Sequence, residues 1–172
     1  MKRVLTEIFQ FALIAVFIIL PFRLFVAQPF LVNGQSMYPT FNNGDYLIVD
    51  QLSYRFEDPE RGSVLIFRYP NDPSTFFIKR IIGLPGEKIE IEGNVVKIDG
   101  EVLSEEYVKL TKTDNLSVTL APDEYFVMGD NRSGSSDSRY WGPLEKKHII
   151  GRPIIQLIPI NQISIFPGDY SN

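Results

Sequence analysis

The sequence predicts a mainly β protein: an antiparallel β-sheet or barrel-like domain with a smaller β insertion, preceded by one N-terminal transmembrane helix. Short runs of β-branched and aromatic residues recur through most of the chain, separated by Gly, Pro, Asn and Asp, as in strands joined by turns. The N-terminal region differs, because it holds one long apolar stretch. With 44% hydrophobic residues among 172, the chain can form one domain with a core of its own.

The apolar stretch runs almost without a break from Ile8 to Leu20 and continues to Ala27. A helix over residues 8–27 would be about 30 Å long, which matches one hydrocarbon core. A cleaved signal peptide is an alternative, but Arg23 and the Gln28-Pro29 pair fit a cleavage region poorly. A buried core helix is a third interpretation, although such helices are rarely apolar on every side.

A retained anchor is therefore the favoured interpretation of the N-terminal region. We expect a membrane anchor over residues 1–28 and an extracytoplasmic domain over residues 29–172. Lys2 and Arg3 precede the apolar stretch, so the positive-inside rule places the N-terminus in the cytoplasm and predicts a single crossing of the cell membrane. A lipid membrane is thus one expected partner.

The rest of the chain is expected to form short strands. Asp99-Gly100, between two apolar runs, is a strong hairpin signal. Leu84-Pro85-Gly86 suits a type II turn, because Pro sets φ and Gly accepts a positive φ. A β subdomain is expected as an insertion over about residues 88–122, with a polar loop at residues 104–115. The expected strands cover residues 45–50, 63–69, 76–82, 88–92, 94–98, 101–103, 116–120, 125–128 and 148–157.

The composition excludes several classes of function. The net charge is −4 and no basic stripe is present, so nucleic acid is not an expected partner. The chain has no Cys, which excludes thiolate chemistry and disulfides. Its single histidine, His148, excludes most metal sites built on paired imidazoles.

The most informative stretch is Gly129–Arg139, which concentrates serines among carboxylates and guanidinium groups. Because arginine presents a rigid planar fork to a carboxylate, these residues are predicted to build a fixed hydrogen-bonded platform. The structural alternative is a solvated loop, whose exposed ion pairs would contribute little to stability. The residues concerned are Asp130, Arg132, Ser135, Ser136, Asp137, Ser138 and Arg139.

Two upstream residues would use such a platform. Ser36 is a candidate nucleophile, and Lys79 is a candidate base for it. A lysine acting as a base near neutral pH needs its pKa lowered by about three units, or ~4 kcal/mol, which burial can supply. The neighbouring carboxylates must then bind arginines rather than Lys79, and the hydroxyl of Ser135 or Ser136 can orient the neutral amine.

Each of these residues also has a purely structural interpretation. Ser36 can be a turn residue beside Pro39. Lys79 can be an edge-strand lysine that discourages aggregation. A pair between Ser36 and His148 is a further possibility for catalysis.

Taken together, the segments show a specific family resemblance. The chain resembles the type I signal peptidases, which are membrane-bound serine–lysine proteases, and a Gram-positive-like branch of them. The resemblance rests on four blocks that stand in the family's order behind an N-terminal anchor. The blocks are Ser36–Thr40, Gly44–Val49, Lys79–Glu87 and Gly129–Gly142.

The resemblance implies roles for individual residues. Ser36 would be the nucleophile, with its backbone N–H in the oxyanion hole, and Lys79 the general base. Ser135 would position the lysine, while Gly34 stands where some members have a serine donor. Asp137 and Arg139 would form a structural salt bridge. Asp130 and Arg132 would brace the same loop, with Arg80 as a further supporting residue.

The resemblance also implies the substrate. Family members cut exported preproteins after Ala-X-Ala-like residues, reading the small side chains in shallow apolar pockets, and need no metal or organic cofactor. An extended peptide would add as a strand beside residues 76–78 and 31–34. The candidate pocket residues are Phe30, Val32, Met37, Leu47, Ile66, Phe77 and Ile78.

Two rival functions are compatible with parts of the sequence. A self-cleaving regulatory serine–lysine protease would carry a DNA-binding helical region where this chain has its apolar stretch. An anchored β-domain that only binds exported peptides would share the anchor and fold but would not need all three candidate side chains.

Overall fold

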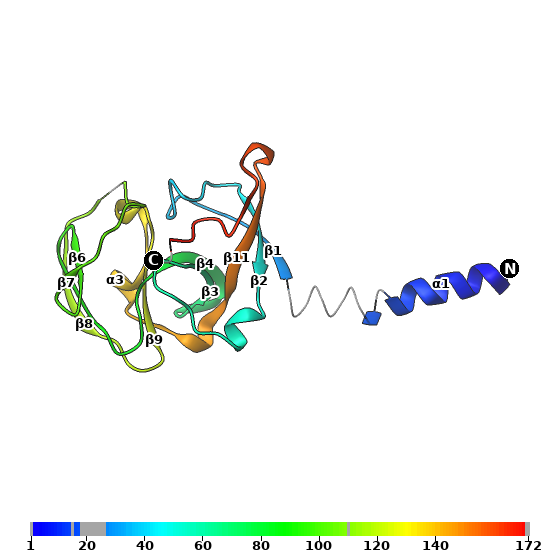
Figure 1. Cartoon of the computed structure of the whole chain (residues 1–172), viewed down its shortest axis with the longest axis horizontal. Helices are drawn as coiled ribbons and strands as arrows, with labels where there is room; N and C mark the ends of the chain where they lie inside the picture. The colour runs from blue at the N-terminus through cyan, green and yellow to red at the C-terminus, as the bar shows by residue number, and fades with distance from the viewer. Residues whose placement is uncertain (1, 15, 18–26, 110, 171–172) are drawn as a thin grey trace.

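The computed structural model describes residues 2–14, 16–17, 27–109 and 111–170, which form a mainly β protein (Figure 1). The larger of its two sheets has eight strands in the order β1-β2-β11-β3-β4-β9-β10, with β12 paired to β11. The smaller sheet has the order β7-β6-β5-β8 and lies at the opposite end of the domain from β1 and β2 (Figure 1). The strand pairs are antiparallel, so the prediction of a mainly antiparallel β fold is confirmed.

The strands of the larger sheet cover both halves of the chain. They are β1 (Ala27–Leu31), β2 (Tyr46–Asp50), β3 (Val64–Tyr69), β4 (Asp72–Gly83), β9 (Glu124–Met128), β10 (Leu144–Glu145), β11 (Ile149–Ile158) and β12 (Ser164–Ile165). Strand β3 lies between β11 and β4, and the four residues Val64–Phe67 are all buried, as expected for a continuous apolar run covered on both faces. The strand order begins at β1 and ends at β10, and no pair joins these two edges in the described chain.

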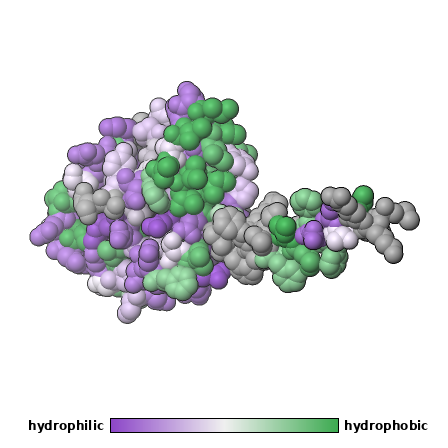
Figure 2. All heavy atoms as spheres, turned by 45° about the vertical axis from the view of Figure 1, so that its right-hand side comes forward, coloured by the Kyte–Doolittle hydropathy of each residue, from purple (hydrophilic) through white to green (hydrophobic). Residues whose placement is uncertain are grey.

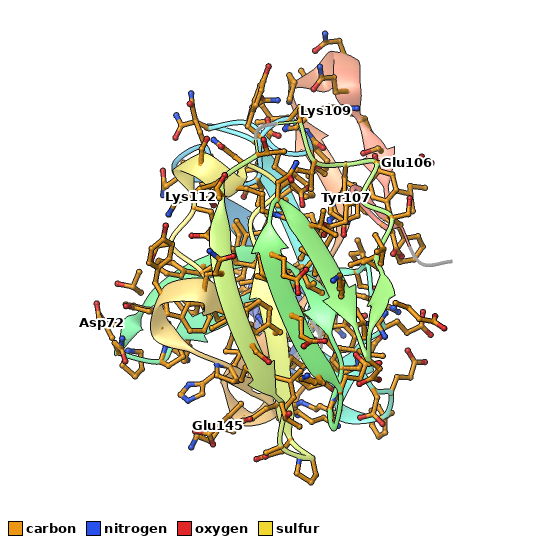
Figure 3. All side chains as sticks on the ribbon, turned by 90° about the vertical axis from the view of Figure 1, so that its left-hand side faces the viewer. Asp72, Glu106, Tyr107, Lys109, Lys112 and Glu145 are labelled. Atoms are coloured by element: carbon orange, nitrogen blue, oxygen red, sulfur yellow. The ribbon has the colours of Figure 1, made fainter. Side chains whose placement is uncertain are left out.

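The smaller sheet is formed by one continuous segment. Its strands are β5 (Lys88–Gly93), β6 (Val95–Ile98), β7 (Glu101–Val102) and β8 (Asp114–Thr119), which lie within the 88–122 range predicted for an insertion. The predicted hairpin is present, with Asp99 and Gly100 at φ of 50° and 88° between β6 and β7. The loop from β7 to β8, which carries Tyr107, Lys109 and Lys112, runs along one end of this sheet (Figure 3).

Three clusters of buried side chains make up the core. One lies between the two sheets and includes Ile82, Ile89, Phe126 and Met128. Gly83 permits this approach, because a Cβ there would collide with Ile89. A second cluster centres on Phe67 and Ile81, and the third packs Met37 and Phe41 against strands β2 and β3. Adjacent residues of β4 therefore face different clusters, as the two-residue period of a strand requires.

The N-terminal helix, α1 (Lys2–Ile14), is 13 residues long. No helix in the described part of the chain combines the length and apolar character needed to cross a bilayer. Residues 15 and 18–26, which belong to the predicted anchor, lie outside the described residues. One detail of the prediction is wrong: Ala27 and Gln28 belong to strand β1 and pair with β2, not to a helix.

The remaining helices are single turns. They are η2 (Ser53–Arg55), η3 (Arg132–Gly134), α3 (Ser138–Trp141), η4 (Lys146–His148) and η5 (Ile160–Gln162). Two of them, η3 and α3, fall in the polar Gly129–Arg139 stretch and fold it into a compact loop. Asn131 caps η3 by accepting from the N–H of Gly134, and Asp137 caps α3 by accepting from the N–H of Arg139.

Candidate active site

Ser36 lies on the loop that joins β1 to β2. The base of this loop is closed by two backbone hydrogen bonds between its ends, Val32 N–H to Asp45 O and Gly44 N–H to Val32 O, both 2.9 Å. Met37 and Phe41 are almost fully buried beneath the loop. The loop is therefore fixed by its own apolar side chains, and Ser36 is held at its surface.

Lys79 lies on β4, opposite Leu65 of β3. Its Nζ is 2.8 Å from the Oγ of Ser36 and 2.9 Å from the backbone oxygen of Ile78. The side chain is 3% exposed, and the ring of Phe77, two residues earlier on the same strand face, has its centroid 5.1 Å from Nζ. The structure thus brings together the two residues that the sequence predicted to act together.

Burial changes the protonation of this amine. Removal from water lowers the pKa of Lys79 to about 8, and the charges of Asp137 and Asp130 oppose that change. With a pKa near 8, roughly a tenth of the Lys79 amines would be neutral at pH 7, whereas an ordinary lysine would have fewer than one in a thousand. Lys79 can therefore accept a proton from Ser36 at moderately alkaline pH.

Asp137 is neutralised by arginine. The guanidinium of Arg139 binds it in a two-point contact of 2.7 and 2.8 Å, and the N–H of Gly129 donates to the same carboxylate at 3.0 Å. Burial alone would raise the pKa of Asp137, but the hydrogen bonds and charge of Arg139 outweigh it and keep the pKa below its usual value. The carboxylate stays ionised without Lys79 as its partner.

Asp130 is neutralised by Arg80, the residue after the lysine. Two contacts of 2.8 and 2.6 Å join the pair, and Arg80 is 0% exposed. Arg80 also donates to the backbone oxygens of Gly62 and Gly168, and its guanidinium lies 4.1 and 4.9 Å from the ring centroids of Tyr107 and Tyr170. The N–H groups of this buried cation are therefore hydrogen-bonded, and two neighbouring aromatic rings pack beside it.

Asp130 and Arg132 bind different partners. Arg132 donates to the backbone oxygen of Gly129 at 3.1 Å, within its own loop, and also binds Glu105, in the β7–β8 loop, at 2.9 and 2.5 Å. Asp130 binds Arg80 instead. The reason lies in the sheet register: Arg80 of β4 is opposite Met128 of β9, so its side chain reaches Asp130 from the neighbouring strand. Arg132 consequently ties the platform to the smaller sheet.

The serines of the platform have different environments. The hydroxyl of Ser138 accepts from the N–H of Val127 and is structural. Ser136 lines the groove beside Ser36. Ser135 is buried, and its hydroxyl lies beside the Asp137 carboxylate, where it helps to keep the pKa of Asp137 low, but it makes no hydrogen bond to Lys79. The role of Ser135 in orienting the lysine stays a prediction.

A groove of about 670 Å³ opens in front of Ser36 and Lys79. It contains six of the seven predicted pocket residues: Phe30, Val32, Leu47, Ile66, Phe77 and Ile78. Met37 is the exception, because it points down into the core instead. His148 is not a groove residue, and a second cavity of about 770 Å³, lined by charged side chains around Glu60 and Arg61, contains neither Ser36 nor Lys79.

Sequence reasoning missed several residues of the site. Thr75 lines the groove because β4 continues past the lysine towards the turn, and Gln35 and Gly134 line it as well. Tyr107 and Tyr170 enclose Arg80 from segments without any local signal. Asn131 was visible within the Gly129–Arg139 stretch but was assigned no role.

The family model described as "Signal peptidase, peptidase S26" matches residues 5–158. The chain is 38% identical over 158 residues to "Probable signal peptidase I-1" of Synechocystis sp., which covers 87% of this chain and 81% of that protein. It is 37% identical over 164 residues to "Signal peptidase I P" of Bacillus subtilis subsp. natto, covering 88% and 86% respectively.

A solved structure is also similar. A crystal structure of a signal peptidase I from Enterococcus faecalis V583 matches with a TM-score of 0.50 and 31% sequence identity, covering 56% of this chain and 97% of that chain. The cyanobacterial and Bacillus relatives are nearly equally identical to this chain, so the identities do not single out the Gram-positive branch.

Proposed function

The chain belongs to the peptidase S26 family of signal peptidases, and we propose that it is a membrane-anchored serine endopeptidase that removes signal peptides from exported preproteins, with Ser36 as nucleophile and Lys79 as base. The observation that carries this proposal is the 2.8 Å contact between Ser36 Oγ and a buried Lys79 Nζ at the wall of the groove. Nucleophile and base within hydrogen-bond reach are what activation of a serine requires.

The proposed reaction proceeds through an acyl-enzyme. Neutral Lys79 takes the hydroxyl proton of Ser36 while Oγ bonds to the scissile carbonyl carbon, leaving an oxyanion that backbone N–H groups stabilise. The Lys79 ammonium then gives its proton to the leaving amine as the peptide C–N bond breaks. A water next gives a proton to the amine and attacks the ester, which releases the carboxylate and restores Ser36.

The arginines support this chemistry through charge. If Asp130 and Asp137 were unpaired, both would favour the protonated, inactive form of Lys79. Their contacts with Arg80 and Arg139 supply compensating positive charge instead. The amine therefore lies near two carboxylates without being the partner of either.

The substrate is proposed to bind as an extended strand. Strand β4 pairs with β9 through Arg80, Ile81 and Gly83, so residues 75–79 have no strand on that side among the described residues. The β1 edge of the larger sheet is likewise open in the described chain. A peptide lying in the groove between them can bond to free backbone groups, while the apolar walls admit small side chains at the cleavage site.

We propose further that residues 1–28 anchor the protein with a single crossing and that the peptidase domain, residues 29–172, lies outside the cytoplasm at the membrane surface. Exposed apolar side chains support the second part. Ile158, Ile160, Ile163, Ile165 and Phe166 are exposed around the end of β11 and β12. Figure 2 shows hydrophobic side chains gathered at this end of the domain. Such a patch suits contact with lipid.

The test replaces each reacting side chain separately. Ser36→Ala and Lys79→Met should each abolish cleavage of a preprotein, while Lys147→Met, which changes an exposed lysine paired with Glu145, should leave it intact. Labelling of Ser36 by an acylating peptide mimic separates an enzyme from a domain that merely binds peptides. Cleavage retained by either the Ser36 or the Lys79 variant would remove this pair from consideration.

A further inference from the structure

Asn131 lies behind the loop that carries Ser36 and contacts it twice. Its backbone N–H donates to the backbone oxygen of Ser36 at 3.0 Å, and its side-chain Nδ2 donates to the backbone oxygen of Gln35 at 3.1 Å. Both accepting carbonyls belong to consecutive peptide groups, one on each side of the Ser36 Cα. One buried residue therefore holds the peptide units before and after the nucleophile.

The contact with Gln35 also determines where the Ser36 N–H points. The carbonyl of Gln35 and the N–H of Ser36 are the two ends of one planar trans peptide, so they point in opposite directions. Asn131 lies outside the groove lining, whereas Gln35 and Ser36 belong to it. With the carbonyl bonded to Asn131, the N–H is turned towards the groove. It donates to no acceptor within the part of the chain that the structure describes.

The loop around this peptide is restrained as well. Upstream, the N–H of Gly34 donates to the side-chain oxygen of Asn43 at 2.8 Å, and Gly34 has a φ of 94°, which glycine adopts readily. Downstream, the N–H of Tyr38 donates to the Gln35 oxygen at 3.2 Å, as in a turn. Two contacts thus hold the Gln35–Ser36 peptide directly, and of these the bond from Asn131 Nδ2 comes from outside the nucleophile loop.

We propose that the side chain of Asn131 is a positioning residue that aims the Ser36 N–H at the oxyanion of the substrate. This inference rests on the proposed function, because an oxyanion forms only if Ser36 attacks a carbonyl. Gly34 offers no side-chain donor, so the oxyanion depends on backbone donors whose direction must be fixed before the reaction. A preorganised donor stabilises charge that develops in the transition state and does little for the bound substrate.

Asn131→Ala is the first test. The substitution removes the Nδ2 donor together with the Oδ1 cap of η3, but it keeps the backbone bond from residue 131 to Ser36, so the platform and loop remain joined. We expect kcat to fall about 10- to 100-fold, less than outright loss of an oxyanion donor, with KM within about twofold. Ser133→Ala is the matched control, because the Ser133 hydroxyl bonds to the Oδ1 of Asn131 and not to the Nδ2 donor or the nucleophile loop among the described residues, and it should keep full activity.

A peptide aldehyde gives a second readout that a merely structural role would not move. Ser36 Oγ adds to the aldehyde carbon, the hydroxyl proton passes to Lys79, and the former carbonyl oxygen becomes the oxyanion. Affinity for the aldehyde should therefore fall by the same factor as kcat. Affinity for an analogue with a reduced peptide bond, which forms no oxyanion, should stay unchanged.

Asn131→Asp keeps the proposal testable if the alanine variant folds poorly. The carboxylate preserves the acceptor used by Gly134 N–H and Ser133 but has no donor for Gln35, so it should show the same loss of kcat. Both variants are measured on the high-pH plateau, where Lys79 is already neutral and a change in its pKa does not alter kcat.

The outcomes separate this inference from the proposed function. A normal kcat in both Asn131 variants, or a rise in KM alone, overturns the role of Asn131. The proposed function would still hold in that case, provided that the Ser36→Ala and Lys79→Met proteins are inactive. Cleavage by Ser36→Ala would instead overturn the proposed function itself. Equal losses of affinity for the aldehyde and for the reduced analogue would assign Asn131 to substrate binding and would also contradict the inference.

Discussion

At the scale of single residues, Lys79 shows what a buried base costs. The pKa of Lys79 is lowered from 10.5 to about 8 because burial penalises the ammonium. The difference corresponds to roughly 3 kcal/mol of lost stability below about pH 8, where Lys79 itself must be protonated in the folded protein. No other described lysine has this environment, since the rest with a resolved change have a raised pKa from carboxylate or hydroxyl partners.

Lys79→Met is therefore expected to stabilise the fold while abolishing activity. Below pH 8 the substitution removes the penalty of about 3 kcal/mol, offset by about 1–2 kcal/mol for two lost hydrogen bonds, so a net gain of about 1–2 kcal/mol is expected at pH 7. Because the lowered pKa makes the unfolded chain bind more protons between pH 8 and 10.5, wild-type stability rises through that window and the advantage disappears. Denaturant unfolding of the wild type and the variant at pH 7 and pH 10 measures the difference between their free energies of unfolding. An advantage of equal size at both pH values would contradict the explanation.

The residue scale also shows what sequence can and cannot predict about the site. Ser36 and Lys79 were predicted to act together from their local blocks, and the structure places their side chains in contact. The sequence required an arginine partner for Asp130 without indicating which one, and the register of β4 and β9 supplies Arg80. Tyr170 could not be found, since nothing near it in sequence indicates that it covers Arg80. Partners across strands depend on pairing, which local patterns do not contain.

At the scale of elements, β4 organises the site through its two-residue period. Phe77 and Lys79 share one face, and Phe77 packs against Phe67 and Tyr69 with centroid distances of 6.2 and 4.6 Å. This aromatic group covers one side of the amine. Phe76 points the other way, is 41% exposed and meets Phe30 edge to face. Phe77 therefore covers the amine, while Phe76 contributes to the groove from the opposite face of the strand.

Phe77→Ala should move the pH dependence of cleavage. In the wild type, kcat/KM is expected to rise with pH as Lys79 loses its proton and to level off above about pH 8. Removing the ring admits water, which stabilises the ammonium and raises the pKa of Lys79 towards 10.5. A rise of about one unit would lower kcat/KM roughly tenfold at pH 7 and leave the alkaline plateau nearly unchanged.

Phe76→Ala is the control from the opposite face of the same strand. It should alter KM through the groove wall but leave the midpoint of the pH profile in place. Identical pH midpoints in the wild type and Phe77→Ala would show that the ring does not protect the amine.

The boundaries of elements explain how much of the fold was predictable. Alternation identified β5 correctly, and Asp99-Gly100 placed the β6–β7 turn. Strand β4 begins at Asp72, four residues before the prediction, because Tyr69 pairs with Asp72 across a tight turn that carries no apolar signal. Strand β1 was missed because its start continues the apolar stretch before it. Both errors arise where the strand depends on its partner rather than on its own sequence.

At the scale of the whole molecule, the two sheets are linked through the active-site platform. Arg132 binds Glu105 with both side chains largely buried, and Arg139 binds Asp114 at 2.7 Å. Glu105 lies in the β7–β8 loop, and Asp114 is the first residue of β8, so both ion pairs reach the smaller sheet. Tyr107 of the same loop packs against Arg80. The smaller sheet therefore helps to fix the residues around Lys79, although it contributes nothing to the lining of the groove.

The exposed apolar residues around β11 and β12 are predicted to contact lipid when the full chain is in a membrane. The chain has no Cys, so a single cysteine can report on one position through an environment-sensitive dye. Ile160→Cys, at a residue that is 80% exposed, should give a dye spectrum shifted to shorter wavelength in vesicles, because transfer of such a side chain from water to lipid is favourable by about 1.5–3 kcal/mol. Val102→Cys, on the smaller sheet and 67% exposed, should keep an aqueous spectrum. Equal spectra at both positions would mean that this end of the domain stays in water.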